Sequence, residues 1–478
     1  MQTPCPLRSA ALASPDAPAI VSGGVTLSYQ ELDLRVSAAS HRLTELGCEA
    51  GSRVALYLSK DESYVVLLLA LLRSGSVACP VSTRVPPDGV TALLRKAGCK
   101  VLVSDDEELL EVVDSTIQKL RPETVLRENA AGAAPQDPET VVLDQPATIV
   151  FTSGSTGTPK AALHTFGNHY YSALGSNTNI TLAPGDRWLH SLPLYHVGGL
   201  SILFRCLLAG ATISLPDTHT PLGEAIVRYG ATHISLVATQ LQRLLNEGAN
   251  LSSLKAILMG GGPMPDRLVD EAFDHNLPIH TSYGLTEMAS QVTTTSPGAD
   301  AEELHASGRV LPNREVSISE EGEILVRGAT LFAGYVEGAD IERARDKDGW
   351  FHTKDLGTLE ADGSLRVRGR RDNLFISGGE NIQPEEIEDA LGRIEGVEQA
   401  VVVPILDEEF GERPVAFVQT VSGTLDPRYL AKELEPILPR FKIPGAFHAW
   451  PMDAPEGMKA DRTFLRERAR QLIERGLE

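Results

Sequence analysis

The chain has 478 residues, of which 42% are hydrophobic and 22% charged, a composition typical of a soluble globular protein of about three structural units. Its net charge of −21 argues against a nucleic-acid partner, because phosphate backbones are bound through clustered Lys and Arg. Its five scattered cysteines form no CxxC pair, which disfavours structural zinc and is typical of a cytoplasmic protein. No apolar run approaches the ~20 residues that span a bilayer, so no integral membrane segment is expected.

Strand-like and helix-like segments alternate along most of the chain, which predicts an α/β fold. The pattern predicts a buried strand over 54–58, a largely buried helix over 62–74 and a short strand over 100–104. A polar stretch rich in Pro, Ala and Gly predicts a long surface loop over 121–137. A strand over 147–151 then runs directly into a segment rich in Gly, Ser and Thr.

Two further strands, predicted over 233–237 and 256–259, also end in loops, and three glycines follow the second. Such strand ends are where open α/β sheets bind ligands. The chain becomes rich in strands and glycines from residue 323, and a small α+β unit follows, with helices over 384–394 and 427–438 and strands over 400–405 and 415–420. We therefore predict a large N-terminal α/β domain of several subdomains (1–371) and a small C-terminal α+β domain (372–478).

The segment from Thr152 to Lys160 offers hydroxyls, backbone N–H groups and a terminal cation, which are the groups that wrap a polyphosphate. A flexible linker would not usually follow a buried strand or end in Pro-Lys. A Walker A loop is excluded, because Pro159 precedes Lys160 and Ala161 follows it, where that motif needs Gly-Lys and then Ser or Thr. The predicted phosphate-binding residues are Thr152, Ser153, Gly154, Ser155, Thr156, Gly157 and Lys160.

Further motifs follow and precede the phosphate loop across nearly the whole chain. They are LSYQEL (27–32), PLYH (193–196), GGGPMP (260–265), YGLTE (283–287), WFHTKD (350–355), GRRD (369–372), SGG (377–379), IQPEEI (382–387) and a C-terminal Lys459. In this order they resemble the AMP-forming acyl-CoA synthetase, luciferase and peptide-synthetase adenylation superfamily. The resemblance implies ATP and Mg²⁺ as ligands, an acyl-AMP intermediate, coenzyme A as co-substrate and a mobile C-terminal domain.

The resemblance also implies roles for single residues. Adenylation joins a carboxylate to the α-phosphate, so developing negative charge must be neutralised. Thr286 is expected to supply a hydroxyl for phosphate and Glu287 a carboxylate for Mg²⁺, which prefers oxygen ligands. Asp355, assisted by Arg370, is expected to bind the ribose diol. The residues implied to lie against adenine are Gly260, Gly261, Gly262 and Tyr283.

The resemblance also implies that the C-terminal domain rotates between adenylation and thioester formation, and three positions are expected to take part in these two steps. Asp372 stands where the family has its hinge, and Gly379 where it lines the thiol tunnel. Lys459 stands at the adenylation lysine, which bridges the acid and the phosphate. Its local sequence, Pro455-Glu-Gly-Met-Lys459, departs from the usual Asn/Ser-Gly-Lys. This departure favours one alternative to an enzyme, a pseudoenzyme that binds nucleotide as a scaffold or sensor.

Three features concern the acid: the extension of YGLTE into MASQVTT (288–294), the motif LYHVGGL (194–200) and Arg205. They resemble the o-succinylbenzoate–CoA ligases of menaquinone biosynthesis, whose substrate is an aromatic dicarboxylate. Arg205 lies in an otherwise apolar, helix-like run, so the cation needs an anionic partner. That partner is either a carboxylate of the protein or the non-reacting carboxylate of the substrate, which the fork of Arg suits. His196 is expected beside the reacting carboxylate, next to the acyl pocket.

Two other enzymes fit the same motifs. One is another aryl- or acyl-CoA ligase, of benzoate or malonate type, and the other is a stand-alone adenylation domain that charges a carrier protein. The sequence is compatible with a homo-oligomer.

Overall fold

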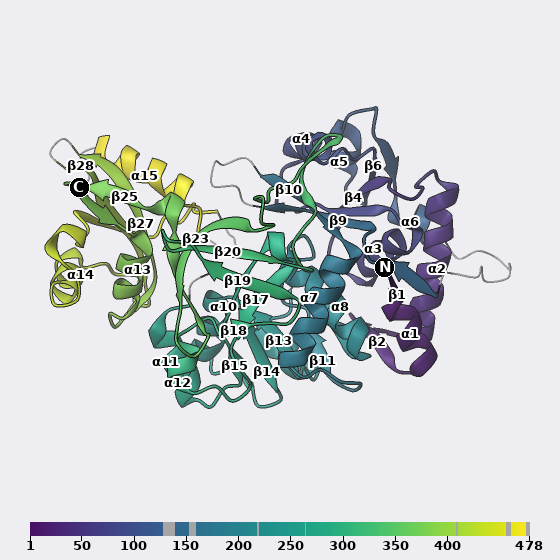
Figure 1. The fold of residues 1–478 in the computed structure, drawn as a ribbon, viewed down its shortest axis with the longest axis horizontal. Helices are drawn as coiled ribbons and strands as arrows, with labels where there is room; N and C mark the ends of the chain where they lie inside the picture. Colours follow the sequence, from purple (N-terminus) through teal and green to yellow (C-terminus); the bar gives the residue numbers. More distant parts are fainter. Residues whose placement is uncertain are drawn as a thin grey trace.

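The computed structural model describes residues 1–127, 139–152, 159–217, 219–262, 264–407, 410–455 and 460–474. Figure 1 shows a large body built by most of the chain and, at the left of the view, a smaller body built by the C-terminal residues. The large body is mixed α/β, and the smaller one combines a single sheet with three helices. The fold class predicted from the sequence is thus confirmed.

The first large sheet carries the expected phosphate loop. Its strands are, in spatial order, β22 (Asp340–Glu342), β21 (Gly334–Glu337), β10 (Lys160–Thr165), β9 (Pro146–Thr152), β5 (Val77–Pro80), β4 (Arg53–Tyr57), β6 (Val101–Ser104) and β7 (Gln118–Leu120). From β9 to β7 neighbouring strands are parallel, whereas β10 returns antiparallel to β9. Strand β21 then pairs with β10, placing Tyr335 opposite Ala162. Residues distant in sequence therefore meet beside the loop.

The second large sheet has seven strands, all parallel except for one edge strand. In spatial order they are β15 (Ile279–His280), β14 (Ala256–Met259), β13 (His233–Leu236), β11 (Arg187–Leu189), β12 (Thr212–Leu215), β2 (Pro18–Ser22) and the antiparallel β3 (Val25–Ser28). The predicted strands at 233–237 and 256–259 are the neighbours β13 and β14. Because they are parallel, the loops that follow them leave the sheet at the same edge.

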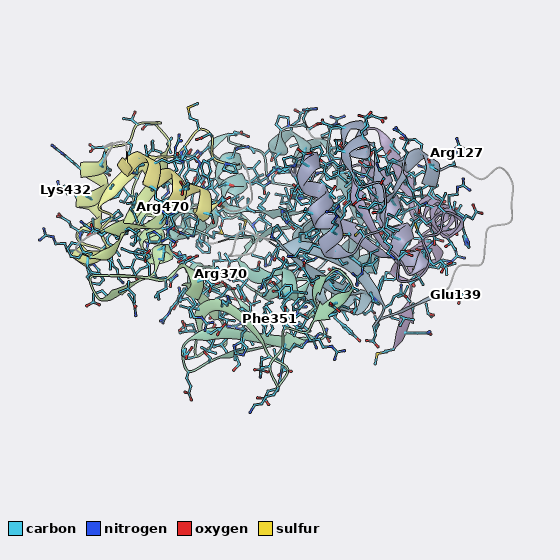
Figure 2. The ribbon with its side chains drawn as sticks, turned by 90° about the horizontal axis from the view of Figure 1, so that it is seen from above. Arg127, Glu139, Phe351, Arg370, Lys432 and Arg470 are labelled. Carbon is cyan, nitrogen blue, oxygen red and sulfur yellow. The ribbon has the colours of Figure 1, made fainter. Side chains whose placement is uncertain are left out.

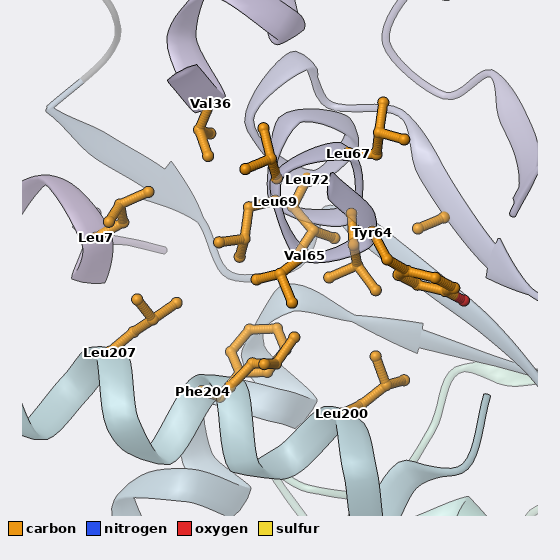
Figure 3. Close-up of a cluster of buried hydrophobic side chains, with 14 of the residues drawn as sticks. Leu7, Val36, Tyr64, Val65, Leu67, Leu69, Leu72, Leu200, Phe204 and Leu207 are labelled. Atoms are coloured by element: carbon orange, nitrogen blue, oxygen red, sulfur yellow. The ribbon is translucent and has the colours of Figure 1, made fainter. Parts of the chain in front are cut away.

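Helices fill the space between the two large sheets. The largest core cluster takes buried residues from both sheets and from α1 (Pro6–Ala13), α2 (Tyr29–Glu45), α3 (Glu62–Ser74), α7 (Phe166–Asn179) and α8 (Val197–Ala209). Figure 3 shows side chains of α3 facing Leu200, Phe204 and Leu207 of α8. Helix α3 is buried at every position from 64 to 72, as its apolar sequence predicts. It begins at Asp61, whose side chain accepts a hydrogen bond from the Tyr64 N–H.

Two smaller antiparallel sheets complete the large body. One contains β16 (Ser282–Leu285), β17 (Ser290–Thr294) and β18 (Arg309–Val310). The other contains β19 (Arg314–Ile318), β20 (Glu323–Gly328), β23 (Phe351–Leu359) and β24 (Leu365–Arg370). The motifs YGLTE (283–287), WFHTKD (350–355) and GRRD (369–372) begin on or overlap strands of these two sheets.

The C-terminal body is one sheet with helices on both faces. Its strands are β26 (Glu380–Ile382), β25 (Phe375–Ser377), β28 (Gly411–Thr420), β27 (Val397–Asp407) and β29 (Ala446–Ala449). One core contains side chains of α13 (Pro384–Gly392) and α14 (Pro427–Leu434), and the other contains side chains of α15 (Arg462–Glu474). The domain border at residue 372 falls between β24 and β25 and stays a prediction.

Part of the surface loop expected over 121–137 is helical. The helix α6 (Pro122–Val125) starts with Pro122, which suits the first position of a helix because its missing N–H would have no partner there. Residues 128–138 lie outside the described ranges. The remaining elements are β1 (Gln2–Pro4), β8 (Thr140–Val142), α4 (Pro87–Ala97), α5 (Glu107–Val112), α9 (Leu222–Arg228), α10 (Ala238–Asn246), α11 (Asp266–Asp274) and α12 (Ala301–Leu304). No helix in the described part of the chain is long and apolar enough to cross a membrane.

Candidate active site

The β9–β10 hairpin holds both ends of the expected phosphate loop. Thr152 and Lys160 are direct partners across the hairpin, so the loop leaves and re-enters the sheet at adjacent points. The Lys160 ammonium lies over the ring of Tyr335, 4.5 Å from its centroid. The predicted phosphate-binding residues that lie outside the described ranges are Ser153, Gly154, Ser155, Thr156 and Gly157.

The glycine turn after β14 lies against strand β16. A Cβ atom added to Gly260 would stand 3.3 Å from Ser282 Oγ, and that hydroxyl donates to the Met259 carbonyl at 2.6 Å. Gly261 has a φ of +91°, which L side chains rarely adopt, whereas a Cβ at Gly262 would meet open space. The turn and the β16 strand that carries the predicted adenine-stacking tyrosine are therefore adjacent.

Tyr283, Asp355 and Arg370 form one connected group. The Tyr283 hydroxyl donates to Asp355 Oδ2 at 2.6 Å, and Arg370 Nη1 lies 3.2 Å from Asp355 Oδ1. Asp355 and Arg370 are also register partners across β23 and β24. Burial and the neighbouring Asp355 raise the pKa of Tyr283, so its phenol stays a proton donor. The structure thus brings the residue expected at adenine together with the two expected at the ribose.

The expected hinge residue Asp372 lies in the short turn 371–373 between β24 and β25. It forms ion pairs with Lys354 at 3.2 Å and with Arg370 at 3.8 Å. Arg370 therefore joins the predicted ribose-binding carboxylate to the predicted hinge. Figure 2 shows Arg370 where the β23–β24 sheet meets the C-terminal body.

The turn of Thr286 and Glu287 is fixed through its main chain. His164 on β10 donates from Nε2 to the Thr286 carbonyl at 2.7 Å, and the Phe332 N–H donates to the Glu287 carbonyl at 2.8 Å. Burial lowers the pKa of His164 to about 4, so the ring is neutral at pH 7. The turn ends at Ala289, whose φ is +54°.

The carboxylate of Glu287 is held by Tyr335, a residue that belongs to none of the sequence motifs. The Tyr335 hydroxyl donates to Glu287 Oε1 at 2.5 Å. Burial and the Glu287 charge raise the pKa of Tyr335, which keeps this donor protonated. A tyrosine in an ordinary strand carries no sequence signal of this role, because the contact depends on β21 lying beside β10.

Arg205 is almost fully buried, with 1% of its surface exposed, on helix α8. Burial lowers its pKa to about 10, so it remains a cation at pH 7. Its Nη2 donates to Gln291 Oε1 at 2.8 Å and to Ser290 Oγ at 3.2 Å, and its guanidinium lies 5.1 Å from the centre of the Trp188 ring. Within the described ranges Nε and Nη1 have no hydrogen-bond partner, and the bonds of Nη2 go to neutral side chains rather than to a carboxylate. Of the two expected partners, the protein carboxylate is therefore not found among the described residues.

A second buried cation, Arg314, lies close to Arg205 and was missed from the sequence. It donates to the main-chain carbonyls of Gln291, Pro312, Tyr171 and Ser172. Burial, and then the charge of Arg205, lower its pKa to about 9. All three nitrogens of the Arg314 guanidinium donate hydrogen bonds to main-chain carbonyls. In Arg205 only Nη2 donates a hydrogen bond among the described residues, and its acceptors are side chains.

The other predicted residues lie at element ends. His196 precedes the first residue of α8, with its ring 4.8 Å from that of Tyr195. Gly379 lies in the exposed β25–β26 turn with a φ of +86°, and a Cβ there would meet open space. Lys459 lies outside the described residues.

Comparison with known proteins finds two family models along the chain. The model described as "AMP-binding enzyme" matches residues 7–336, and "AMP-binding enzyme C-terminal domain" matches residues 386–454. The 2-succinylbenzoate–CoA ligase of Bacillus cereus strain AH820 is 33% identical, with 98% of each chain covered.

Solved structures of o-succinylbenzoate CoA synthetase (MenE) from Bacillus subtilis are similar as well. The complex with the acyl-adenylate intermediate OSB-AMP has a TM-score of 0.88 at 30% identity, covering 98% of both chains. The complex with ATP and a magnesium ion has a TM-score of 0.87 at 30% identity, covering 98% of this chain and 100% of the other. The chain therefore belongs to the AMP-binding enzyme family, within which it is similar to the 2-succinylbenzoate–CoA ligases over almost its whole length.

Proposed function

We propose that this protein is a 2-succinylbenzoate–CoA ligase of menaquinone biosynthesis. One carboxylate of the acid attacks the α-phosphorus of ATP, pyrophosphate leaves, and an acyl-AMP remains. The thiolate of coenzyme A then attacks the acyl carbonyl and AMP leaves. The family match and the OSB-AMP and ATP–magnesium complexes of the similar B. subtilis protein support this reaction.

The observation that carries the choice of acid is the environment of Arg205. A buried guanidinium is costly unless an anion compensates it, and its described partners are the neutral Ser290 and Gln291. Two of its nitrogens remain available among the described residues. A substrate with a second carboxylate supplies the missing charge in a geometry that a guanidinium can bind through two bonds. In this proposal His196, at the start of the same helix, lies on the side of the reacting carboxylate.

The nucleotide is proposed to bind along β9–β10, the glycine turn and β16. Lys160 and Thr152 flank the phosphates, Tyr283 stacks on adenine beside Gly260, and Asp355 with Arg370 holds the ribose. The Tyr283 bond to Asp355 supports this, because it fixes the two predicted nucleoside contacts against each other.

Glu287 and Thr286 fit a Mg²⁺ site of the kind formed by one or two carboxylates together with substrate phosphates. Glu287 presents a carboxylate whose Oε1 is already fixed by Tyr335. When bound, the ion would neutralise charge on the phosphates as pyrophosphate leaves. Tyr335, His164 and the Phe332 N–H keep this carboxylate in place.

The C-terminal residues are proposed to serve both half-reactions. Lys459 bridges acid and phosphate during adenylation, and rotation about Asp372 then brings Gly379 to the path of the thiol. Gly379 has a φ of +86°, a conformation that glycine adopts most readily, and lies in an exposed turn that a rotation of the C-terminal residues could bring to the thiol. All five cysteines are free and buried, which supports the proposed cytoplasmic location, and the net charge of −21 disfavours nucleic acid as a partner.

The identity of the acid can be tested with a panel of acids. Purified protein with MgATP and coenzyme A is given 2-succinylbenzoate, benzoate or malonate, and both pyrophosphate release and thioester are measured. We expect thioester with 2-succinylbenzoate and at least 10-fold lower kcat/KM with benzoate, because benzoate leaves Arg205 without a counter-ion. Turnover with benzoate or malonate but not with 2-succinylbenzoate would contradict the proposed substrate.

The same assay separates the remaining alternatives. Acid-dependent exchange of pyrophosphate into ATP distinguishes an enzyme from a nucleotide-binding pseudoenzyme. Exchange without thioester formation, followed by transfer to a phosphopantetheine carrier, would instead indicate a stand-alone adenylation domain.

A further inference from the structure

Tyr335 contacts both charged groups that the proposed function places at the phosphates. Its hydroxyl donates to Glu287 Oε1 at 2.5 Å, while the Lys160 ammonium lies 4.5 Å from the centre of its ring. The two contacts use different parts of the side chain, the hydroxyl for the carboxylate and the π face for the cation. The Tyr335 side chain thus lies between the Glu287 carboxylate and the Lys160 ammonium and contacts both.

The surroundings of Tyr335 hold the ring in this place. Tyr335 pairs with Ala162 across β10 and β21, two residues after Lys160, so its position relative to the phosphate loop is set by the sheet. The Phe332 ring packs edge-on against it at a centroid distance of 4.8 Å. The Phe332 N–H also donates to the main-chain carbonyl of Glu287. The same short segment therefore binds Glu287 through both its main chain and its carboxylate.

The hydrogen bond also decides which carboxylate oxygen is left for a ligand. Among the described residues, Oε1 of Glu287 accepts the Tyr335 proton, and no described donor bonds to Oε2. A carboxylate restrained at one oxygen and through its main chain offers the other oxygen at a fixed position. Groups that restrain a metal-binding carboxylate in this way typically change metal affinity about 10- to 100-fold when they are removed.

We infer that Tyr335 is a positioning residue that couples the Mg²⁺ carboxylate Glu287 to the phosphate-loop lysine Lys160. This inference rests on the proposed function for ATP and Mg²⁺ but not on the identity of the acid. The hydroxyl governs how much Mg²⁺ strengthens ATP binding, and the ring governs ATP binding through Lys160 whether or not Mg²⁺ is present.

The test measures ATP binding to the full chain by titration calorimetry, with and without Mg²⁺ and without acid or coenzyme A. The Mg²⁺ enhancement is the ratio of the ATP dissociation constants without and with the ion. For Tyr335→Phe we expect that enhancement to fall roughly 10-fold or more while ATP affinity without Mg²⁺ stays within about 2-fold of the parent protein. For Tyr335→Leu, which removes the ring as well, ATP affinity without Mg²⁺ should also fall by roughly 2- to 30-fold.

A double-mutant cycle shows whether Tyr335 acts through Glu287. Glu287→Gln should abolish most of the Mg²⁺ enhancement, and adding Tyr335→Phe to it should change the enhancement little further. Tyr171→Phe is the matched control, because the Tyr171 hydroxyl lies at the surface and contacts only Met1 Sδ among the described residues. Thermal unfolding of each variant confirms that it is folded.

Two results would overturn the inference: a normal Mg²⁺ enhancement in Tyr335→Phe, or an effect of Tyr335→Phe that is just as large in the Glu287→Gln background. Because no acid is present, these outcomes are independent of the acid panel. A protein that fails to activate 2-succinylbenzoate but shows the expected cycle would refute the proposed substrate and leave the role of Tyr335 standing.

Discussion

Two arginines buried side by side show how the same side chain can serve structure or ligand binding. Arg314 gives its donors to four main-chain carbonyls from three segments and thereby ties helix α7 to strands β17 and β19. Arg205 bonds only two neutral side chains and keeps two nitrogens without a partner in the described ranges. Removal of Arg314 should therefore cost stability, whereas removal of Arg205 should cost affinity for an anion.

Arg205→Met tests this at constant volume, because the unbranched Met side chain fills space similar to that of Arg. We expect the KM for 2-succinylbenzoate to rise roughly 10- to 100-fold, the loss of a charge-assisted contact, with the KM for ATP nearly unchanged. Steady-state kinetics with each substrate varied in turn measures both. Equal losses for the acid and for ATP would show that Arg205 is structural. Arg314→Met should instead lower the melting temperature.

At the scale of elements, segments with strong local signals were predicted well. Helix α3 has its predicted bounds because its apolar run is preceded by Asp61 and followed by Gly75. Strand β14 also has its predicted bounds, because its apolar run stops at Gly260. The short strands β16, β17, β25 and β26 were not predicted, since each has few residues and pairs only in the folded protein. Tyr335 and Arg314 were missed for the same reason, and Gln291 was included only as part of the motif 288–294, without its contact to Arg205. Their partners are set by pairing between distant strands, which a linear pattern does not contain.

The cap of α3 provides a test at this scale. Asp61→Ala removes the acceptor of the Tyr64 N–H at 2.9 Å and leaves that N–H, at the start of the buried part of α3, without its cap. We expect a loss of about 1 kcal/mol in stability, seen as a lower melting temperature in calorimetry. Asp61→Asn keeps a side-chain acceptor and should lose much less. Equal melting temperatures for the Ala and Asn variants would contradict a capping role.

At the scale of the whole molecule, buried neutral histidines set its response to acid. His164, His169 and His190 are each at most 1% exposed, and burial lowers their pKa values, to about 4 for His164 and about 3 for His190. The unfolded chain binds protons on these rings below about pH 6.5, whereas the folded protein does not. Their contribution to stability is therefore complete above pH 6.5 and is lost as the pH falls toward 4.

We accordingly expect the free energy of unfolding to fall by up to about 1.4 kcal/mol per histidine for each pH unit between pH 6.5 and pH 5. The melting temperature should fall steeply over the same range. His164→Gln keeps an N–H donor for the Thr286 carbonyl but cannot bind a proton, so its pH slope should be shallower. His275→Gln, at an exposed position, serves as the control. Identical slopes for the parent protein and His164→Gln would show that His164 does not contribute.

The pairing of β21 with β10 has a consequence for how the chain acquires its activity during synthesis. Ala162 leaves the ribosome long before its partner Tyr335. Until β21 is synthesised, the edge of β10 that will pair with it therefore has no partner strand. Long-range strand pairing of this kind is slow, and exposed edges favour association between chains. A chain released before residue 337 would carry the phosphate-loop hairpin but not the strand that closes it. Nucleotide binding should therefore appear only after β21 has been synthesised and has paired with β10.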